Sequence, residues 1–274
     1  MKVYDIPEGA KSSKGRAIQN ILNIEADNRI TASITIKSLN DKEFTSTHSL
    51  IFCTQNGTIK KTSLEDYSRP RQNGINAINL VEGDKVVAVR LTNGENDILV
   101  ANSNGRAVRF NESTVRNMGR NATGVRAITL DNDGQDHVVG MIAIENPEEE
   151  TVMIVSEYGY GKRSEIEDYR KTNRGGKGVK TINITEKTGK LISIQSVTDD
   201  NDLMIINKSG ITLRLDVSTI RVMGRATQGV RLINLEKRGD QIASICKVNS
   251  EPEVTEETEA TNGENVDTVE NGNN

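Results

Sequence analysis

The chain combines 274 residues with 34% hydrophobic residues, a mean hydropathy of −0.53, 3% aromatic residues and no Trp. This composition allows one large or two ordinary domains and argues against aromatic-lined ligand pockets and base-stacking platforms. The net charge of −4 hides an asymmetry, because residues 251–274 carry eight acidic residues and no Lys or Arg, which leaves residues 1–250 with a net charge of +4.

Targeting and redox signals are weak along the whole chain. No apolar run approaches the roughly 20 residues that cross a bilayer. The N-terminal stretch Met1–Asp5 lacks the apolar segment of a signal peptide. Cys53 and Cys246 lie far apart in apolar runs, which favours reduced thiols over a disulfide framework. We therefore expect a soluble, cytoplasmic protein.

Residues 1–37 resemble the second half of a repeat that recurs four times after them. Lys14-Gly15-Arg16 occupies the position of a glycine loop, and Ile18–Leu22 is predicted to form the strand that follows. Because nothing precedes Met1 to supply the first half of the unit, we expect a chain that starts inside a repeat. A natural start with a shortened first unit is the alternative.

The four complete units have a fixed internal spacing. Each has an apolar β run, a first Gly in a turn, a strand, a loop with a second Gly, and an alternating strand. The first glycines are Gly57, Gly105, Gly159 and Gly210. The second glycines follow 17, 19, 19 and 19 residues later, at Gly74, Gly124, Gly178 and Gly229. Four residues after each first Gly stands a cation: Lys61, Arg109, Arg163 and Arg214.

This pattern predicts an all-β repeat fold of four-stranded, propeller-like blades, either closed in a ring or opened into a spiral. The X-Gly turns between alternating runs are strong hairpin signals. Helical periodicity is never sustained before residue 250, although 112–118 and 217–222 could each hold one short turn. A β-sandwich would explain the strands but not the spacing. We expect a pinwheel domain over 1–250, with an incomplete first blade, and a disordered acidic tail over 251–274.

The most basic loop is Arg174-Gly175-Gly176-Lys177-Gly178-Val179, where three glycines and two cations share one turn. Exposed amide groups and fixed positive charge suit a phosphate. A solvated turn is the alternative for one such loop, but weaker copies recur with the repeat. Lys and Arg on β surfaces also serve as solvated faces and edge protection, which does not predict their phase with the glycines.

A curved band of cations without aromatic platforms fits double-stranded DNA held by its phosphates. The predicted DNA-binding residues are Lys14, Arg16, Lys61, Arg71, Arg109, Arg120, Arg126, Arg163, Arg170, Lys171, Arg174, Gly175, Gly176, Lys177, Gly178, Lys180, Arg214, Arg225 and Arg231. Catalysis is not indicated, because His48 and His137 lack partners at a motif spacing and no metal-ligand, Walker or nucleophile-elbow motif occurs. We predict no catalytic or metal-binding residue.

Two stretches, Asn117–Arg126 and Val222–Val230, resemble the blade signatures of the C-terminal domain of the bacterial DNA gyrase A protein. Lys2–Pro7 and Gly159–Arg163 are also similar to that family. The resemblance implies a six-bladed β-pinwheel that wraps DNA around its rim and supports negative supercoiling. By resemblance the chain is part of an ATP-hydrolysing type II topoisomerase, an isomerase.

The same resemblance implies partners and a diagnostic loop. The partners are double-stranded DNA, the gyrase B protein and the rest of the gyrase A protein, in a heterotetramer, without a membrane. ATP and Mg²⁺ serve the full complex, whereas this chain lacks the ATP site and the catalytic tyrosine. The family's box reads Gln, basic, Arg, Gly, Gly, basic, Gly, and Thr172–Gly178 matches only its last five positions. It also lies later in the chain than the first blade.

Two other functions stay open from the residues. The corresponding domain of topoisomerase IV has fewer or degenerate blades, whereas the regular repeats and acidic tail here favour gyrase. A protein-interaction propeller would present an apolar or mixed-charge face, whereas this sequence places its regularity in glycines and cations.

Overall fold

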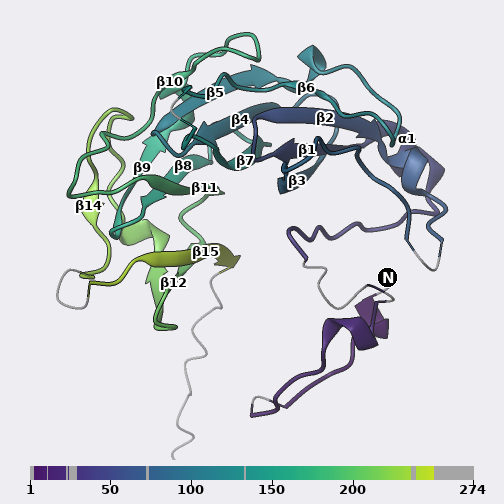
Figure 1. Cartoon of the computed structure of the whole chain (residues 1–274), viewed down its shortest axis with the longest axis horizontal. Helices are drawn as coiled ribbons and strands as arrows, with labels where there is room; N and C mark the ends of the chain where they lie inside the picture. Colours follow the sequence, from purple (N-terminus) through teal and green to yellow (C-terminus); the bar gives the residue numbers. More distant parts are fainter. Residues whose placement is uncertain are drawn as a thin grey trace, which may run out of the picture.

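The computed structural model describes residues 3–10, 12–22, 24, 30–71, 74–132, 134–235 and 239–249. Four antiparallel β-sheets follow one another along an arc, and each is built around the buried strand of one repeat (Figure 1). The all-β, propeller-like architecture predicted from the spacing is therefore confirmed. No described helix is long and apolar enough to span a membrane. The predicted tail over 251–274 lies outside the described residues.

Each sheet runs from an inner strand near the centre of the arc to an outer strand at its rim (Figure 1). The first sheet contains β3 (Val86–Thr92), β1 (Ser49–Thr54), β2 (Thr58–Ser63) and β6 (Val125–Arg126). The second contains β7 (Val138–Ile144), β4 (Asp97–Asn102), β5 (Arg106–Asn111) and β10 (Val179–Lys180). The third contains β11 (Leu191–Val197), β8 (Thr151–Ser156), β9 (Tyr160–Glu165) and β14 (Val230–Arg231). The fourth contains β15 (Ile242–Asn249), β12 (Asn201–Asn207) and β13 (Thr212–Asp216).

The outer strand of each four-stranded sheet comes from the next repeat along the chain. In the first sheet, Val125 of β6 pairs with Ile59 of β2. The second and third sheets repeat this register. In each, the residue after a second Gly pairs with the residue two positions after the first Gly of the repeat before. Consecutive blades are thus joined by exchanged strands, and the described part of the fourth sheet has three strands.

The second glycines are required by this exchange. A Cβ atom added to Gly178, whose φ is +76°, would lie 2.4 Å from the main-chain oxygen of Ala107 in the preceding blade. Gly124 and Gly229 have the same environment, with main-chain oxygens at 2.5 and 2.6 Å. By contrast, a Cβ atom on Gly74, the second Gly of the first repeat, would meet no atom within 4 Å. The same holds for Gly210, the first Gly of the last repeat. These two glycines lie at the ends of the described array, where the exchange partner is missing from the described residues.

The hydrophobic core is divided among the blade interfaces. One cluster joins the first two sheets through residues such as Ile51, Ile98 and Phe110, and two equivalent clusters join the second to the third and the third to the fourth. The inner strands β3, β7, β11 and β15 pack against one another in that order. A fourth cluster covers the free side of the first sheet with residues 32–44 and 75–78.

The connections contain short helices at equivalent places in the repeat. The 3-10 helices η4 (Glu112–Thr114) and η6 (Val217–Thr219) confirm the single turns predicted there, and η3 (Leu64–Tyr67) and η5 (Ile166–Asp168) are their equivalents. The pattern does not predict α1 (Lys42–Thr47), which begins where the Asp41 carboxylate accepts hydrogen bonds from the amides of Glu43 and Phe44.

The N-terminal segment differs from its prediction. The sequence predicts a strand over Ile18–Leu22, but Ile18–Asn20 is the 3-10 helix η2, preceded by η1 (Val3–Asp5). Before Ser49 the described residues contain no strand. Figure 1 places residues 3–10 and 12–22 on the open side of the arc, away from the four sheets. A glycine-loop sequence therefore forms an outer strand in the repeats where a preceding blade accepts it.

We expect Gly178→Ala to destabilise the protein by about 3 kcal/mol or more, because the new Cβ must displace the main chain of Ala107 as well as adopt a positive φ. Gly74→Ala is the matched control, since it adds only the conformational strain of about 1 kcal/mol. Urea unfolding of both variants measures the difference. Equal losses at the two positions would show that strand exchange does not require this glycine.

Candidate nucleic-acid interface

The cations predicted to bind DNA fall into a buried and an exposed group. Lys61, Arg109 and Arg163 have 7%, 6% and 5% of their surface exposed and are held by carboxylates and carbonyl groups. Their side chains are almost wholly covered, which leaves little surface for a phosphate. The expectation that these three residues contact DNA stays a prediction, and their burial argues against it.

Arg109 shows what the buried cations do. Its guanidinium forms a 2.9 Å ion pair with Asp97 in its own sheet. It also donates to the main-chain oxygens of Ile166 and Tyr169, at 3.0 and 3.2 Å, in the 3-10 turn of the next repeat. Burial alone would raise the pKa of Asp97, but hydrogen bonds from Lys171, Asn111 and Arg109 hold it below its usual value. Arg109 thus connects two consecutive repeats.

The same position has this role in the neighbouring sheets. Lys61 pairs with Glu112 of the second repeat at 2.7 Å. Arg163 donates to the main-chain oxygen of Val217 in the fourth repeat and pairs with Asp199. We call Lys61, Arg109 and Arg163 the latch cations. Their fixed spacing from the first Gly in the sequence reflects their contacts with the next repeat. The sequence did not predict this structural role.

Arg214, at the equivalent position of the fourth repeat, pairs with Asp202 but keeps a side chain that is 46% exposed. No later repeat lies in the described residues to cover it. Its different environment supports the view that a following blade creates the burial of the latch cations.

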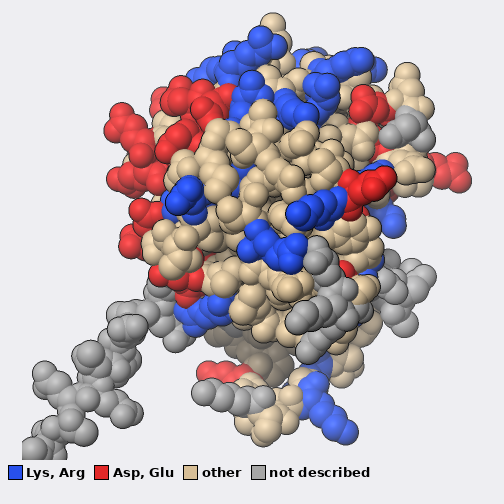
Figure 2. All heavy atoms as spheres, turned by 90° about the vertical axis from the view of Figure 1, so that its left-hand side faces the viewer, with Lys and Arg blue, Asp and Glu red and all other residues tan. Residues whose placement is uncertain are grey.

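The exposed group follows the outer strands and the loops that lead into them. Figure 1 shows the outer strands β6, β10 and β14 along the outside of the arc. We call the members of this exposed group the rim cations. Their side chains are exposed or half-buried: Arg120, Arg126, Arg170, Lys171, Arg174, Lys177, Lys180, Arg225 and Arg231. The view in Figure 2, onto the left side of the arc, shows Lys and Arg along the top and across the middle of this face, with Asp and Glu mostly toward its left edge and some toward its right.

Main-chain contacts between repeats bring rim cations together in pairs. The Arg174 guanidinium donates to the main-chain oxygen of Arg126 at 3.1 Å. One blade further, the Arg225 guanidinium donates to the main-chain oxygen of Lys180 at 2.7 Å. Each contact places the guanidinium of a loop arginine against the main chain of a cationic residue in the preceding outer strand. Cations gathered on adjoining segments favour an anion at the rim.

The Arg174–Gly178 loop is packed more closely than its sequence suggested. The amide of Gly175 donates to Ala127 O at 2.6 Å, and the carbonyl of Gly176 accepts from Thr129 N at 2.9 Å. Since Gly178 closes against Ala107, the Gly175 amide and the Gly178 position serve the fold. Gly176 and Lys177 remain exposed. The loop offers an anion its cationic side chains, while part of its main chain is engaged by the preceding repeat.

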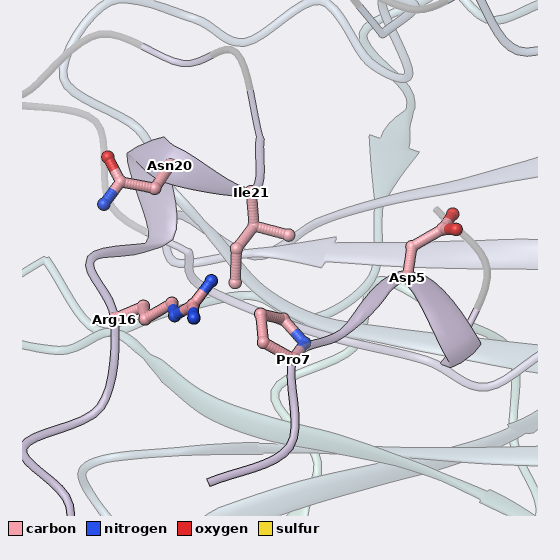
Figure 3. A pocket seen from close by; sticks show the side chains of 5 residues that line it. All are labelled: Asp5, Pro7, Arg16, Asn20 and Ile21. Carbon is pink, nitrogen blue, oxygen red and sulfur yellow. The ribbon is translucent and has the colours of Figure 1, made fainter.

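Three other predicted residues, Lys14, Arg16 and Arg71, are exposed and stand outside the exchanged strands. Arg16 lines a shallow pocket with Asp5, Pro7, Asn20 and Ile21, and Figure 3 shows its side chain directed toward Pro7 and Ile21. The guanidinium of Arg231 lies over the ring of Tyr160, 5.4 Å from its centroid. Lys171 is exposed and forms a 3.0 Å ion pair with Asp97.

Two buried lysines were not singled out from the sequence. Lys60 and Lys162 have 0% of their surface exposed, and burial lowers the pKa of each to about 8. The Lys162 ammonium donates to Gly224 O at 2.6 Å, and that of Lys60 donates to Arg120 O and Ala77 O. The described residues contain no cluster of His, Cys, Asp and Glu that could hold a metal ion.

Tandem blades that exchange their outer strands and carry a cationic rim define a class, the propeller-like repeat domain. A family described as the DNA gyrase C-terminal domain, beta-propeller, matches residues 48–93, 96–145, 150–198 and 201–248. The chain belongs to the DNA gyrase C-terminal domain family. The resemblance noted in the blade sequences is thus confirmed.

Individual relatives agree with this assignment. The chain is 43% identical over 251 residues to the DNA gyrase A protein of Staphylococcus epidermidis, covering 92% of this chain and 27% of that protein. It is 42% identical over 265 residues to the Staphylococcus aureus gyrase A protein, covering 95% and 29%. The chain therefore spans less than a third of the length of these relatives.

Two solved structures share the fold. The crystal structure of the C-terminal domain of DNA topoisomerase IV superposes with a TM-score of 0.76 at 26% identity, covering 86% of this chain and 71% of that chain. A structure of the DNA gyrase A C-terminal domain superposes with a TM-score of 0.74 at 23% identity, covering 86% and 75%.

We expect Arg109→Met to lower the unfolding free energy by about 3–5 kcal/mol, because it leaves the buried Asp97 carboxylate with fewer partners. Arg126→Met is the matched control at an exposed rim position and should change stability by less than about 0.5 kcal/mol. Chemical denaturation measures both. Comparable stability of the two variants would contradict the division into latch and rim cations.

Lys162 makes stability depend on pH. Its pKa is about 8 in the folded chain and 10.5 when unfolded, so below pH 8 both states are protonated and the folded state bears the full burial cost. Proton release between pH 8 and 10.5 relieves that cost. The unfolding free energy of the parent should therefore rise by on the order of 2 kcal/mol relative to Lys162→Met across this interval. A difference that is constant with pH would contradict the assignment.

Proposed function

We propose that this domain binds double-stranded DNA along its outer rim and wraps it, as the C-terminal part of a gyrase A protein. The pairing of rim cations across blade boundaries, Arg126 with Arg174 and Lys180 with Arg225, is the observation that carries the proposal. The contact occurs at two successive blade boundaries. Successive phosphates on a curved duplex would meet them in turn.

The physical basis is counterion release from the DNA backbone. Each phosphate neutralised by Lys or Arg frees condensed cations, so affinity falls steeply with salt and carries little sequence information. Smooth bending by 40–90° over 20–30 base pairs costs of order 1–6 kcal/mol. Charge-assisted contacts contributed by each blade would offset that cost. The latch cations would act indirectly, by holding the blades in their arc.

Membership of the gyrase C-terminal domain family supports a role within a larger enzyme. We propose that wrapping supports ATP-dependent negative supercoiling by a complex with the remainder of the gyrase A protein and with the gyrase B protein. ATP and Mg²⁺ would then act in other parts of that complex, in the bacterial cytoplasm. The accessible residues proposed to approach DNA include Lys14, Arg16, Arg71 and Arg214 in addition to the rim cations.

Topoisomerase IV is the second candidate, because its C-terminal domain superposes well on this chain. The curated relatives at 42–43% identity are gyrase A proteins, which favours gyrase. A protein-interaction propeller would not need cations placed beside one another across successive blade boundaries. Binding that is independent of salt would favour such a propeller.

Binding to linear duplexes of increasing length, from about 20 to 150 base pairs, at two salt concentrations tests DNA binding. We expect affinity to rise with length until the rim is filled and to fall at the higher salt. Arg126→Met with Lys180→Met should weaken binding and lower the salt dependence by about one counterion per cation removed. Affinity that ignores both length and salt would refute the proposal.

Wrapping needs its own measurement. Closed circular DNA relaxed by a nicking-closing enzyme in the presence of the protein should keep a change in linking number, because a wrapped path is trapped when the strand is resealed. The Arg126→Met, Lys180→Met variant is the control and should trap less. Binding without any change in linking number would show that the domain holds DNA without wrapping it.

A further inference from the structure

Lys60 and Lys162 occupy a strand position that the fold does not reserve for lysine. The equivalent residues, three positions after the first Gly, are Val108 in the second blade and Leu213 in the fourth. Aliphatic side chains therefore suffice at this position in two of the four blades. Placing an ammonium group there has a cost, because burial removes it from water. A role beyond packing would explain it.

The two lysines occur with the same companions. Asp66 stands in the 3-10 turn after Lys60, and Asp168 stands at the same place after Lys162. In the second and fourth blades, where the lysine is absent, threonine replaces the aspartate, at Thr114 and Thr219. Lysine and aspartate are thus present together or absent together in this chain.

The third companion is an arginine in the glycine loop of the next repeat. Arg120 acts electrostatically on Lys60, and Arg225 acts on Lys162; in both cases the arginine lowers the lysine pKa and the aspartate raises it. Each constellation therefore contains two cations and one carboxylate.

The lysines contact the loops themselves. The Lys162 ammonium donates to Gly224 O, directly before Arg225, and the Lys60 ammonium donates to Arg120 O. Asp168 completes the arrangement by accepting a hydrogen bond from the Arg225 amide at 3.2 Å. Hydrogen bonds of this kind fix the loop main chain from which the arginine side chain extends.

We infer that Lys60 and Lys162 are positioning residues, which hold the loops bearing Arg120 and Arg225 so that these arginines meet phosphate groups of the bound duplex. This inference rests on the proposed function and adds a division of labour among the blades. Two blades align their rim arginine through a buried lysine. At the second blade, which has no such lysine, Arg174 is held by its own hydrogen bonds to Thr114 O and Arg126 O, whereas Arg225 combines the lysine contact with its hydrogen bond to Lys180 O.

A double-mutant cycle on DNA affinity tests the inference. Lys162→Met and Arg225→Ala should each weaken binding to a long duplex by about fivefold and lower the salt slope by about one, although Lys162 is too buried to touch phosphate. The double variant should bind no more weakly than the weaker single variant, because both changes remove the same contact. Losses that multiply would overturn the inference.

The control is Leu213→Met, which places the same side chain at the equivalent position of the fourth blade and should leave affinity and salt slope unchanged. If Arg225→Ala weakens binding and Lys162→Met does not, the positioning role is wrong while DNA binding stands. If neither Arg225→Ala nor the rim variants change affinity, the proposed function itself fails. Should Lys162→Met not fold, the cycle with Lys60→Met and Arg120→Ala decides, and failure of both lysine variants to fold would overturn the inference.

Discussion

The close approach of one repeat's glycine loop to the preceding blade is the contact on which the rest of the structure depends. At Gly124, Gly178 and Gly229 the main chain of the preceding blade lies so close that a Cβ atom would not fit. The residue after each of these glycines pairs with that blade and completes its sheet. This exchange fixes the register between repeats. It also carries each basic loop to the rim, so the fold and the proposed interface have one cause.

The same contact decides which cations are buried and which remain accessible to solvent. Lys61, Arg109 and Arg163, each four residues after a first Gly, are covered by the following repeat and meet carboxylate or carbonyl groups there. A cation in the glycine loop lies outside the last strand and stays exposed or half-buried. Buried charges need partners at short range, whereas exposed charges remain available to a ligand. A domain of modest net charge can therefore present a strongly basic rim.

Much of the fold could be predicted from the sequence, because the glycine spacing reports contacts that recur in every unit. The central strands, the hairpins and the short turns at Glu112 and Val217 followed from local pattern. Ile18–Asn20 did not form the predicted strand, since an outer strand needs a preceding sheet edge as well as its own sequence. The helix Lys42–Thr47 is too short to show a period, and only the Asp41 cap marks its start.

The sequence by itself determined the repeat, the strand order within each unit and the loops in which cations gather, because these depend on residues close together in the chain. Only the tertiary structure decided which cations face water. Arg109 and Arg126 look alike in the sequence, yet one is buried against Asp97 and the next repeat, and the other is exposed on β6. Electrostatic environment depends on distance in space, and it is the exchanged strands that bring distant repeats within that distance.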